Sequence, residues 1–229
     1  MRNAYKGLGL TAAIAMAGLF AGAASAAVID FDALDATAGQ TVPLTSFSED
    51  GYTFDLSFTG GSAGPAVFDT TCTGYGGTDG CNDDADLQPT VQGENGVSDN
   101  VLILQRSAPG ALIPNDFNDG GRIGFTLTSG KAFFLTGFSA VDDEMFSAID
   151  TDGSTVLGSI TLGSDGETGT ISFRSSRIEI GDTFYFDYAG SGGIDSLTTT
   201  PVPVPAALPL ALSAFGALAW LGRRRRRPV

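Results

Sequence analysis

The sequence predicts an all-β protein, an antiparallel β-sandwich of jelly-roll-like form, and three observations support this fold class. Short segments between residues 27 and 200 alternate apolar and polar side chains, as strands with one buried face do. Clusters of glycine and aspartate interrupt the alternation, and glycine is abundant at 32 of 229 residues. No segment of this region shows the helical period.

Ten segments fit the strand pattern. In chain order they are 27–34, 51–59, 100–106, 122–129, 132–141, 154–163, 169–175, 177–181, 183–189 and 193–199. Many short strands without intervening helices favour two packed antiparallel sheets. Because the first and last strands of such folds commonly lie together, we expect 27–34 to lie beside 193–199, which makes residues 27–200 one ectodomain.

The amino terminus has the features of a secretory signal peptide. Two basic residues precede an apolar stretch over residues 8–20, and the small residues Ala24, Ser25 and Ala26 follow it. This pattern predicts that residues 1–26 are removed by cleavage after Ala26, outside the cytoplasm. The alternative is an uncleaved anchor, which the shortness of the apolar run disfavours.

The carboxyl terminus is predicted to cross a membrane at residues 206–222. The apolar run from Ala206 to Leu221 would span ~24 Å as a helix, somewhat less than a hydrocarbon core of ~30 Å, so Pro205, Gly222 and local thinning contribute. The basic tail 223–229 stays cytoplasmic by the positive-inside rule. A nucleic-acid-binding tail and an amphipathic surface helix are the alternatives; the acidic body disfavours the first, and the run has too few polar residues for the second.

A proline-rich motif over residues 201–205 joins the ectodomain to this helix. The residues of the complete terminal signal are Val202, Pro203, Val204, Pro205, Ala206, Arg223, Arg224, Arg225, Arg226 and Arg227. Motif, apolar helix and arginines together resemble the VPLPA type of the PEP-CTERM sorting signal, with Val204 at the position of the usual leucine. The resemblance covers only the tail. It implies an exosortase-type membrane protease as partner in a Gram-negative bacterium, transient anchoring in the inner membrane, and delivery to the cell surface or extracellular matrix, often alongside exopolysaccharide.

The charges and the missing histidines exclude several function classes. All 26 acidic residues lie between residues 27 and 200, where only five basic residues occur. Such a body repels nucleic acid and anionic lipid and attracts cations, so we expect no nucleic-acid partner. The chain contains no histidine, which excludes Ser-His-Asp triads, Cys-His dyads and His-ligated metals.

The two cysteines, Cys72 and Cys81, lie in a glycine-rich segment. In an oxidising compartment they are predicted to form a disulfide, which would stabilise the fold by ~2.5–3 kcal/mol on the chain-entropy estimate. A redox-active or metal-binding pair is the alternative, and the spacing, which is not Cys-x-x-Cys, disfavours it.

Three acidic residues follow the second cysteine: Asp83, Asp84 and Asp86. Carboxylate and carbonyl oxygens at this density suit Ca²⁺, which takes six to eight oxygen ligands in flexible geometry. The sequence therefore suggests a structural calcium ion here. A solvated acidic turn is the competing interpretation.

A second calcium ion is suggested by Asp30, Asp32 and Asp195, which lie on the predicted first and last strands. If these strands are neighbours, the three carboxylates come near one another. Alternating acidic residues are also typical of a solvated sheet face.

Catalysis is not predicted. Asp142 and Glu144 would be the one same-face pair at the end of a strand, and a glycosidase requires carboxyl groups about 5–10 Å apart with one raised pKa. The alternative function is a carboxylate-dependent glycan hydrolase or lyase. It is disfavoured because histidine is absent and lysine is scarce, which removes most general bases.

Two glycine-containing segments are predicted to be turns. The segment from Asp150 to Thr161 lacks the glycine and glutamate of a calcium-binding EF-hand loop, so we expect a hairpin. The segment before Arg122 is expected to turn into a strand, with this arginine paired locally.

The function that these features favour is an adhesive, matrix or glycan-binding role at the cell exterior, with extracellular polysaccharide as partner. Exposed aromatic rings would stack on sugar rings, and the sequence does not say which rings are exposed. The aromatic residues within predicted strands are Tyr52, Phe54, Phe58, Phe133, Phe134, Phe138, Tyr185 and Tyr188.

Overall fold

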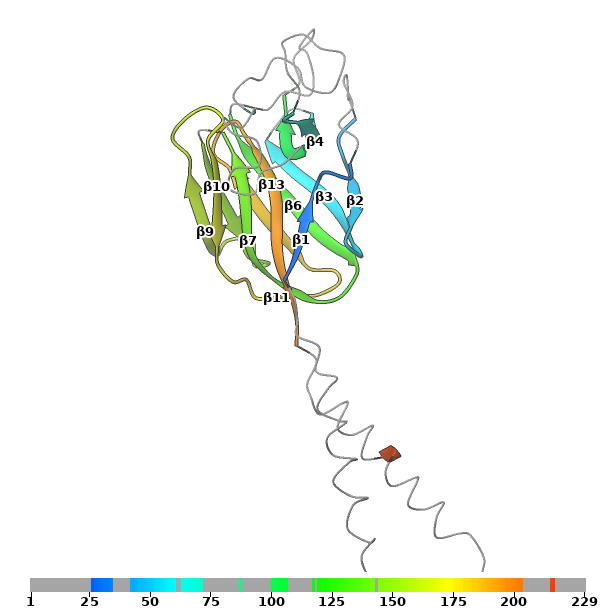
Figure 1. Ribbon diagram of the computed structural model, residues 1–229. Coiled ribbons are helices and arrows are strands. Elements are labelled where there is room, and N and C mark those ends of the chain that lie inside the picture. The colour runs from blue at the N-terminus through cyan, green and yellow to red at the C-terminus, as the bar shows by residue number, and fades with distance from the viewer. Residues whose placement is uncertain are drawn as a thin grey trace, which may run out of the picture. The chain divides into compact units, whose positions relative to one another are not determined.

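Two antiparallel β-sheets face each other across one hydrophobic core (Figure 1). The computed structural model describes residues 26–34, 42–60, 63–71, 87, 100–106, 117, 119–142, 144–203 and 215–216. Residues Ala26–Val202 are a compact unit, and every regular element described in it is a strand. The predicted all-β sandwich is confirmed at this level.

The larger sheet has seven strands and the other has six. The seven-stranded sheet contains β1 (Ala27–Asp30), β4 (Gly64–Asp69), β5 (Asn100–Gln105), β7 (Phe133–Val141), β10 (Thr168–Ser172), β11 (Arg177–Ile178) and β13 (Gly193–Pro201). The six-stranded sheet contains, in spatial order, β2 (Ser46–Glu49), β3 (Tyr52–Gly60), β6 (Gly121–Ser129), β12 (Thr183–Tyr188), β8 (Met145–Ile149) and β9 (Val156–Thr161).

The last strand, β13, lies in the middle of the seven-stranded sheet. It pairs with β7 along its length, with β5 at its beginning and with β1 at its end. In the β1 pairing Ala27 lies opposite Thr199 and Asp30 lies opposite Ser196. The expectation that the first and last strands are neighbours is confirmed.

Three strands lie outside the ten predicted segments, and each has a local reason. β2 has only four residues, too few to show a period. β4 contains Pro65 and is the edge strand next to β5, the position in a sheet where proline is tolerated. β8 follows β7 closely without a glycine or proline between them; the chain breaks instead at Asp142, whose φ is +110°.

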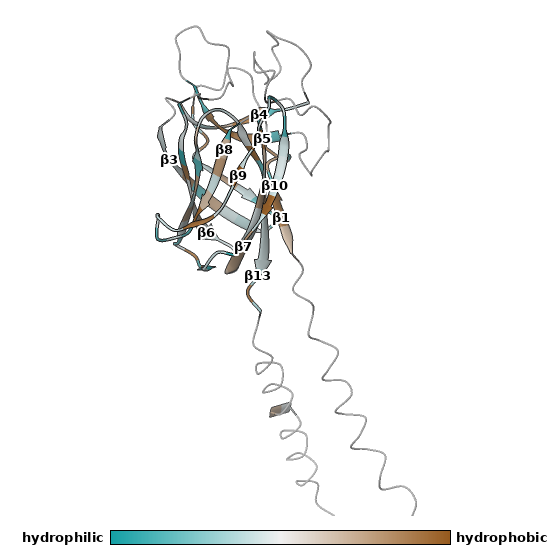
Figure 2. Cartoon of the chain, turned by 90° about the vertical axis from the view of Figure 1, so that its left-hand side faces the viewer, coloured by the Kyte–Doolittle hydropathy of each residue, from teal (hydrophilic) through white to brown (hydrophobic). Residues whose placement is uncertain are grey.

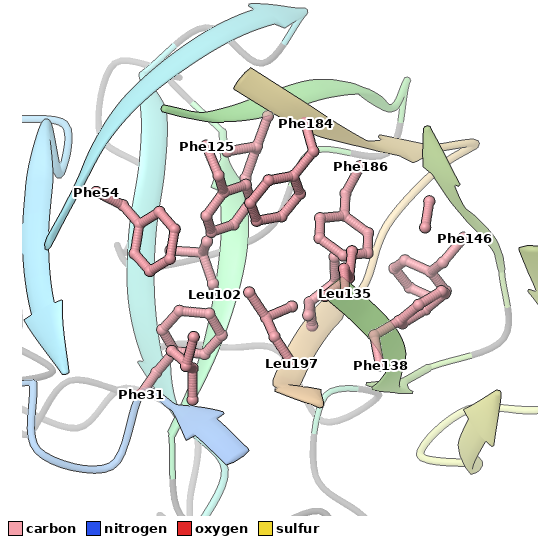
Figure 3. Packing of buried hydrophobic residues seen from close by; sticks show 14 of the residues in the cluster. Phe31, Phe54, Leu102, Phe125, Leu135, Phe138, Phe146, Phe184, Phe186 and Leu197 are labelled. Carbon is pink, nitrogen blue, oxygen red and sulfur yellow. The ribbon is translucent and has the colours of Figure 1, made fainter. Parts of the chain in front are cut away.

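Phenylalanine side chains fill the space between the sheets. Figure 2 shows hydrophobic and hydrophilic residues together along the strands, as expected when one face of each sheet is buried. Phe125 is the centre of the aromatic cluster: its ring stacks on Phe184 at 5.3 Å between centroids and meets Phe186 edge-on at 5.6 Å. Leu102 and Leu197 of the opposite sheet point toward this cluster (Figure 3).

One hydrogen bond inside the core joins the two sheets. Tyr188 of β12 is 4% exposed, and its hydroxyl donates to the carbonyl oxygen of Leu102 in β5 at 2.9 Å. Burial raises the pKa of the Tyr188 phenol well above its ordinary value of 10.0, because the phenolate would be desolvated.

This tyrosine predicts a loss of stability in alkali. In the unfolded chain the phenol ionises near pH 10, whereas in the fold it stays protonated, so the free energy of unfolding is expected to fall as the pH rises above about 10. The stability is fully present below this pH. A Tyr188→Phe variant should be about 1–2 kcal/mol less stable at pH 7 and lose less stability between pH 9 and 11, measured by urea unfolding. An equally steep alkaline loss in the variant would contradict the assignment.

Within the described part of the chain, no helix has the length and apolarity needed to cross a membrane. The tail 223–229, all of the predicted helix 206–222 except residues 215–216, and all of the predicted signal peptide except Ala26 lie outside the described residues. Ala24, Val204, Pro205 and Ala206 are among them. Val202 is described, and its amide donates to the carbonyl oxygen of Ala132 at 3.4 Å.

Candidate functional site

The predicted disulfide and the first predicted calcium site lie outside the described residues. These residues are Cys72, Cys81, Asp83, Asp84 and Asp86. The next residue in the chain, Leu87, is described and fully buried in a second hydrophobic cluster with Val101, Ile103 and Val141. Since the intervening Leu102 points into the main core, this second cluster lies on the outer face of the seven-stranded sheet.

The second predicted calcium site consists of Asp30, Asp32 and Asp195, and the structure describes all three. Asp32 accepts a hydrogen bond from the amide of Asn100 at 3.0 Å, and its own amide donates to Asp30 at 3.2 Å. Burial, opposed by this hydrogen bond, raises the pKa of Asp30. Asp195 is 1% exposed and lies at a register shift in the pairing of β13 with β7. In the pairing of β13 with β1, Ser196 lies opposite Asp30.

Metal-ligating side chains do not gather in the described ranges. No group of three or more Asp, Glu, Cys or His residues there is placed so that it could hold a metal ion. Asp30, Asp32 and Asp195 are thus not placed together as a group of three such ligands.

The two carboxylates considered for catalysis do not share a strand face. β7 ends at Val141 and β8 begins at Met145, so Asp142 and Glu144 lie in the connection between these strands. The expected same-face strand pair is therefore wrong. Asp142 is fully buried and Glu144 is half-buried.

The outer face of the six-stranded sheet carries a different group of polar side chains. In β12, Phe184 and Phe186 point into the core, so Tyr185 between them points outward. We call the surface around this ring the Tyr185 face. Its members, from β3, β6 and β12, are Asp55, Ser57, Arg122, Gly124, Thr126, Thr183, Tyr185 and Asp187.

The ring of Tyr185 lies close to the backbone of β6. Tyr185 is directly opposite Gly124, and a Cβ atom on this glycine would lie 3.0 Å from both Cδ1 and Cε1 of the ring and 2.5 Å from Oγ of Ser57. Any other residue at position 124 would push the ring away. Glycine here therefore allows the half-buried ring to lie against the sheet.

The side chain of Arg122 lies next to the Tyr185 ring and is fixed by three hydrogen bonds. Its Nε and Nη2 donate to the two carboxylate oxygens of Asp187 at 2.5 and 2.8 Å, and its Nη1 donates to the carbonyl oxygen of Gly153 at 3.0 Å. The hydrogen bond to Asp187 raises the pKa of Arg122, so this guanidinium stays protonated. The guanidinium carbon is 5.2 Å from the centroid of the Tyr185 ring, within the range of a cation–π contact.

The hairpin between β8 and β9 supplies the Gly153 carbonyl. Asp152 accepts hydrogen bonds from the Thr155 hydroxyl and from the amides of Thr155 and Ser154, the last two at 2.7 and 2.8 Å. The hydroxyl bond first, and then the two amide bonds, lower the pKa of Asp152 to about 2. The predicted hairpin at this segment is confirmed. It fixes the third partner of Arg122.

Hydroxyl groups cover much of the remaining face. Thr126 and Thr183 share a hydrogen bond of 2.7 Å between their hydroxyls, and Ser48 and Thr53 share one of 2.9 Å nearer the edge strand. Hydroxyls donate and accept, and an aromatic ring offers an apolar surface next to them. This combination suits a ligand that is itself rich in hydroxyls and has apolar C–H patches, as sugars are.

The sequence identified the members of this site only in part. Tyr185 was one of eight candidate aromatics, and five of the others are buried in the core: Tyr52, Phe54, Phe133, Phe138 and Tyr188. Arg122 was expected to pair locally, and this expectation is wrong, since Asp187 is 65 residues away. The alternation of Thr183, Tyr185 and Asp187 with two phenylalanines was the signal that could have revealed the outward face.

Comparison with known proteins places the chain in no family. No protein-family model matches it, and no curated protein sequence is significantly similar to it. Several solved structures share weak similarity with it. The C-terminal CBM6 of LamC, a marine laminarinase from Zobellia galactanivorans, is 17% identical with a TM-score of 0.29, and the match covers 59% of this chain and 98% of that one. The isomalto-dextranase of Arthrobacter globiformis T6, complexed with panose, is 9% identical with a TM-score of 0.28; the match covers 77% of this chain and 32% of that one. At these TM-scores neither likeness bears on function.

Proposed function

We propose that the protein is an exported, non-catalytic β-sandwich that binds polysaccharide outside the cell through the Tyr185 face. The observation that carries the proposal is the ring of Tyr185, held over Gly124 and beside the ion pair of Arg122 and Asp187, on a face lined with hydroxyls. Such a platform supplies stacking and hydrogen bonds without a reactive group.

Export and sorting form part of the proposal. β1 begins at Ala27, so cleavage after Ala26 leaves this strand complete and paired with β13. β13 ends at Pro201, directly before Val202, the first residue of the terminal signal. We propose that an exosortase-type protease acts there while residues 206–222 hold the chain in the inner membrane, and that the jelly-roll-like domain then reaches the surface or matrix.

The absence of catalysis is likewise proposed, with one supporting observation. Asp142 has no exposed surface, so a substrate does not reach this carboxylate in the fold described. A glycan-degrading enzyme would need a second, accessible acid at a suitable separation. The proposal predicts that incubation with a bound polysaccharide releases no new reducing ends.

The proposal also includes a disulfide and a calcium ion that stabilise the segment before Leu87. A Cys72–Cys81 disulfide and a structural Ca²⁺ ion at Asp83, Asp84 and Asp86 would both hold the chain that leads to this buried leucine. Calcium is expected to raise the melting temperature of the oxidised protein, and an unchanged melting temperature in millimolar calcium would refute the ion's role.

The Tyr185→Ala variant tests the binding proposal. Truncating an aromatic residue at the centre of a binding surface commonly costs 2 kcal/mol or more, so we expect affinity for the polysaccharide to fall about 30-fold. The measurement is retardation of the full chain in gels containing polysaccharide. Phe134→Ala is the matched control. The ring of Phe134 also makes a cation–π contact, with the guanidinium carbon of Arg174 4.2 Å from its centroid, but Phe134 belongs to the other sheet. Equal effects of the two variants would contradict the proposed site.

A further inference from the structure

We infer that the Tyr185 face selects neutral polysaccharide and rejects polymers that carry uronate, sulfate or phosphate groups. This inference rests on the proposed function and names the chemical class of its ligand. It follows from the positions of the few charged residues on the six-stranded sheet.

The only basic residue in the six described strands of this sheet is Arg122. Asp187 occupies it with both carboxylate oxygens, and the carbonyl oxygen of Gly153 takes a third N–H group. Recognition of an anionic group by arginine uses the same paired N–H donors that Asp187 already fills. An acidic sugar would therefore have to displace a carboxylate that the sheet holds opposite Arg122 by strand pairing.

The unpaired charge near this face is negative. Asp55 is exposed on β3 and points to the same side as Ser57, which lies beside Gly124 and Tyr185. Like charges placed opposite each other suppress binding, so an anionic polymer is repelled.

Neutral sugars need none of these charges. The paired hydroxyls of Thr126 and Thr183 lie on the same strands as Arg122 and Tyr185, and each can exchange its hydrogen bond for one to a sugar hydroxyl. The ring of Tyr185 offers its apolar surface to the C–H groups of a sugar ring. Among the described residues, the face thus has partners for an uncharged sugar and no free cation for an acidic one.

The test compares polymers with the same backbone and different charge. Hydroxyethylcellulose is paired with carboxymethylcellulose, and dextran with dextran sulfate, in affinity gels with the full chain at low and high ionic strength. We expect at least one neutral member to retard the protein through Tyr185, and its charged counterpart to bind at least about tenfold more weakly at low ionic strength, with a smaller difference in salt.

A charge variant tests the cause. Asp55→Lys places an unpaired cation on the Tyr185 face and should strengthen binding to the acidic member of the pair about tenfold at low ionic strength. Asp165→Lys makes the same change of net charge in the exposed connection between β9 and β10, and should leave the preference unaltered. Equal effects of the two variants would show that net charge, not this face, sets the preference and would overturn the inference.

The outcomes for the parent protein separate the two proposals. Stronger, Tyr185-dependent binding to the charged member of a pair overturns the neutral preference and leaves polysaccharide binding standing. Absence of binding to both members of both pairs counts against the proposed function and removes the inference with it.

Discussion

Replacing Phe125 with alanine is expected to lower the free energy of unfolding by about 3–5 kcal/mol. The ring of Phe125 is fully buried and contacts four other phenylalanines, at centroid distances between 5.3 and 6.2 Å. Its removal leaves a cavity that these rigid rings cannot fill by small movements, so the lost transfer free energy and the cavity cost add together. The measurement is equilibrium unfolding in urea of residues 26–202, the compact unit that contains the whole core.

The control for this variant is Phe134→Ala. Phe134 is half-buried and stands in β7 on the outer face of the seven-stranded sheet, where water can occupy the vacated space. We expect it to cost less than about 2 kcal/mol, because much of the side chain is already in contact with solvent. Similar losses for the two variants would contradict the assignment of Phe125 to the centre of the core.

Replacing Gly120 with alanine is expected to cost about 3 kcal/mol or more. The backbone at Gly120 has φ of +67°, which costs a residue with a side chain about 1–2 kcal/mol. A Cβ atom there would lie 2.3 Å from the carbonyl oxygen of Tyr188 and 2.8 Å from the carbonyl carbon of Ala189. Both are backbone atoms at the end of β12, so relief requires moving a central strand of the sheet.

A Gly51→Ala variant separates the cost of the positive φ from the cost of the steric clash. Gly51 lies in the turn between β2 and β3 with φ of +80°, and a Cβ atom there would meet nothing within 4 Å. We therefore expect this variant to lose only the conformational part, about 1–2 kcal/mol, in the same urea experiment. If the two alanine variants lose equal stability, the close approach of Gly120 to β12 does not contribute.

The Gly120 variant also has a functional consequence. Gly120 lies directly before β6, which carries Arg122 and Gly124, and its close neighbour Tyr188 belongs to β12, which carries Tyr185 and Asp187. A shift between these two strands would disturb the pairing that places Tyr185 over Gly124. Polysaccharide binding by Gly120→Ala should therefore be lost even under conditions in which the variant remains folded.

Alternation along the chain was sufficient to predict most strands. The strand β12 was predicted from the residues Thr-Phe-Tyr-Phe-Asp-Tyr, and in the structure three of its aromatics lie on the core side while Tyr185 lies on the other. The period of a strand is local, because successive side chains point to opposite faces whatever the strand pairs with. β2 was not predicted because it is too short to show a period, and β8 because no glycine or proline separates it from β7. β4 was not predicted because Pro65 interrupts its strand pattern.

The sequence by itself therefore determined the fold class and most strands. Only the tertiary structure decided that Gly124 lies beneath the ring of Tyr185 and that Asp187, rather than a nearby acid, neutralises Arg122. Both facts depend on the register between β6 and β12, strands that are more than fifty residues apart in the chain. Register is set by the packing of many side chains in the core and by close backbone contacts such as that at Gly120, and no local pattern of residues encodes it.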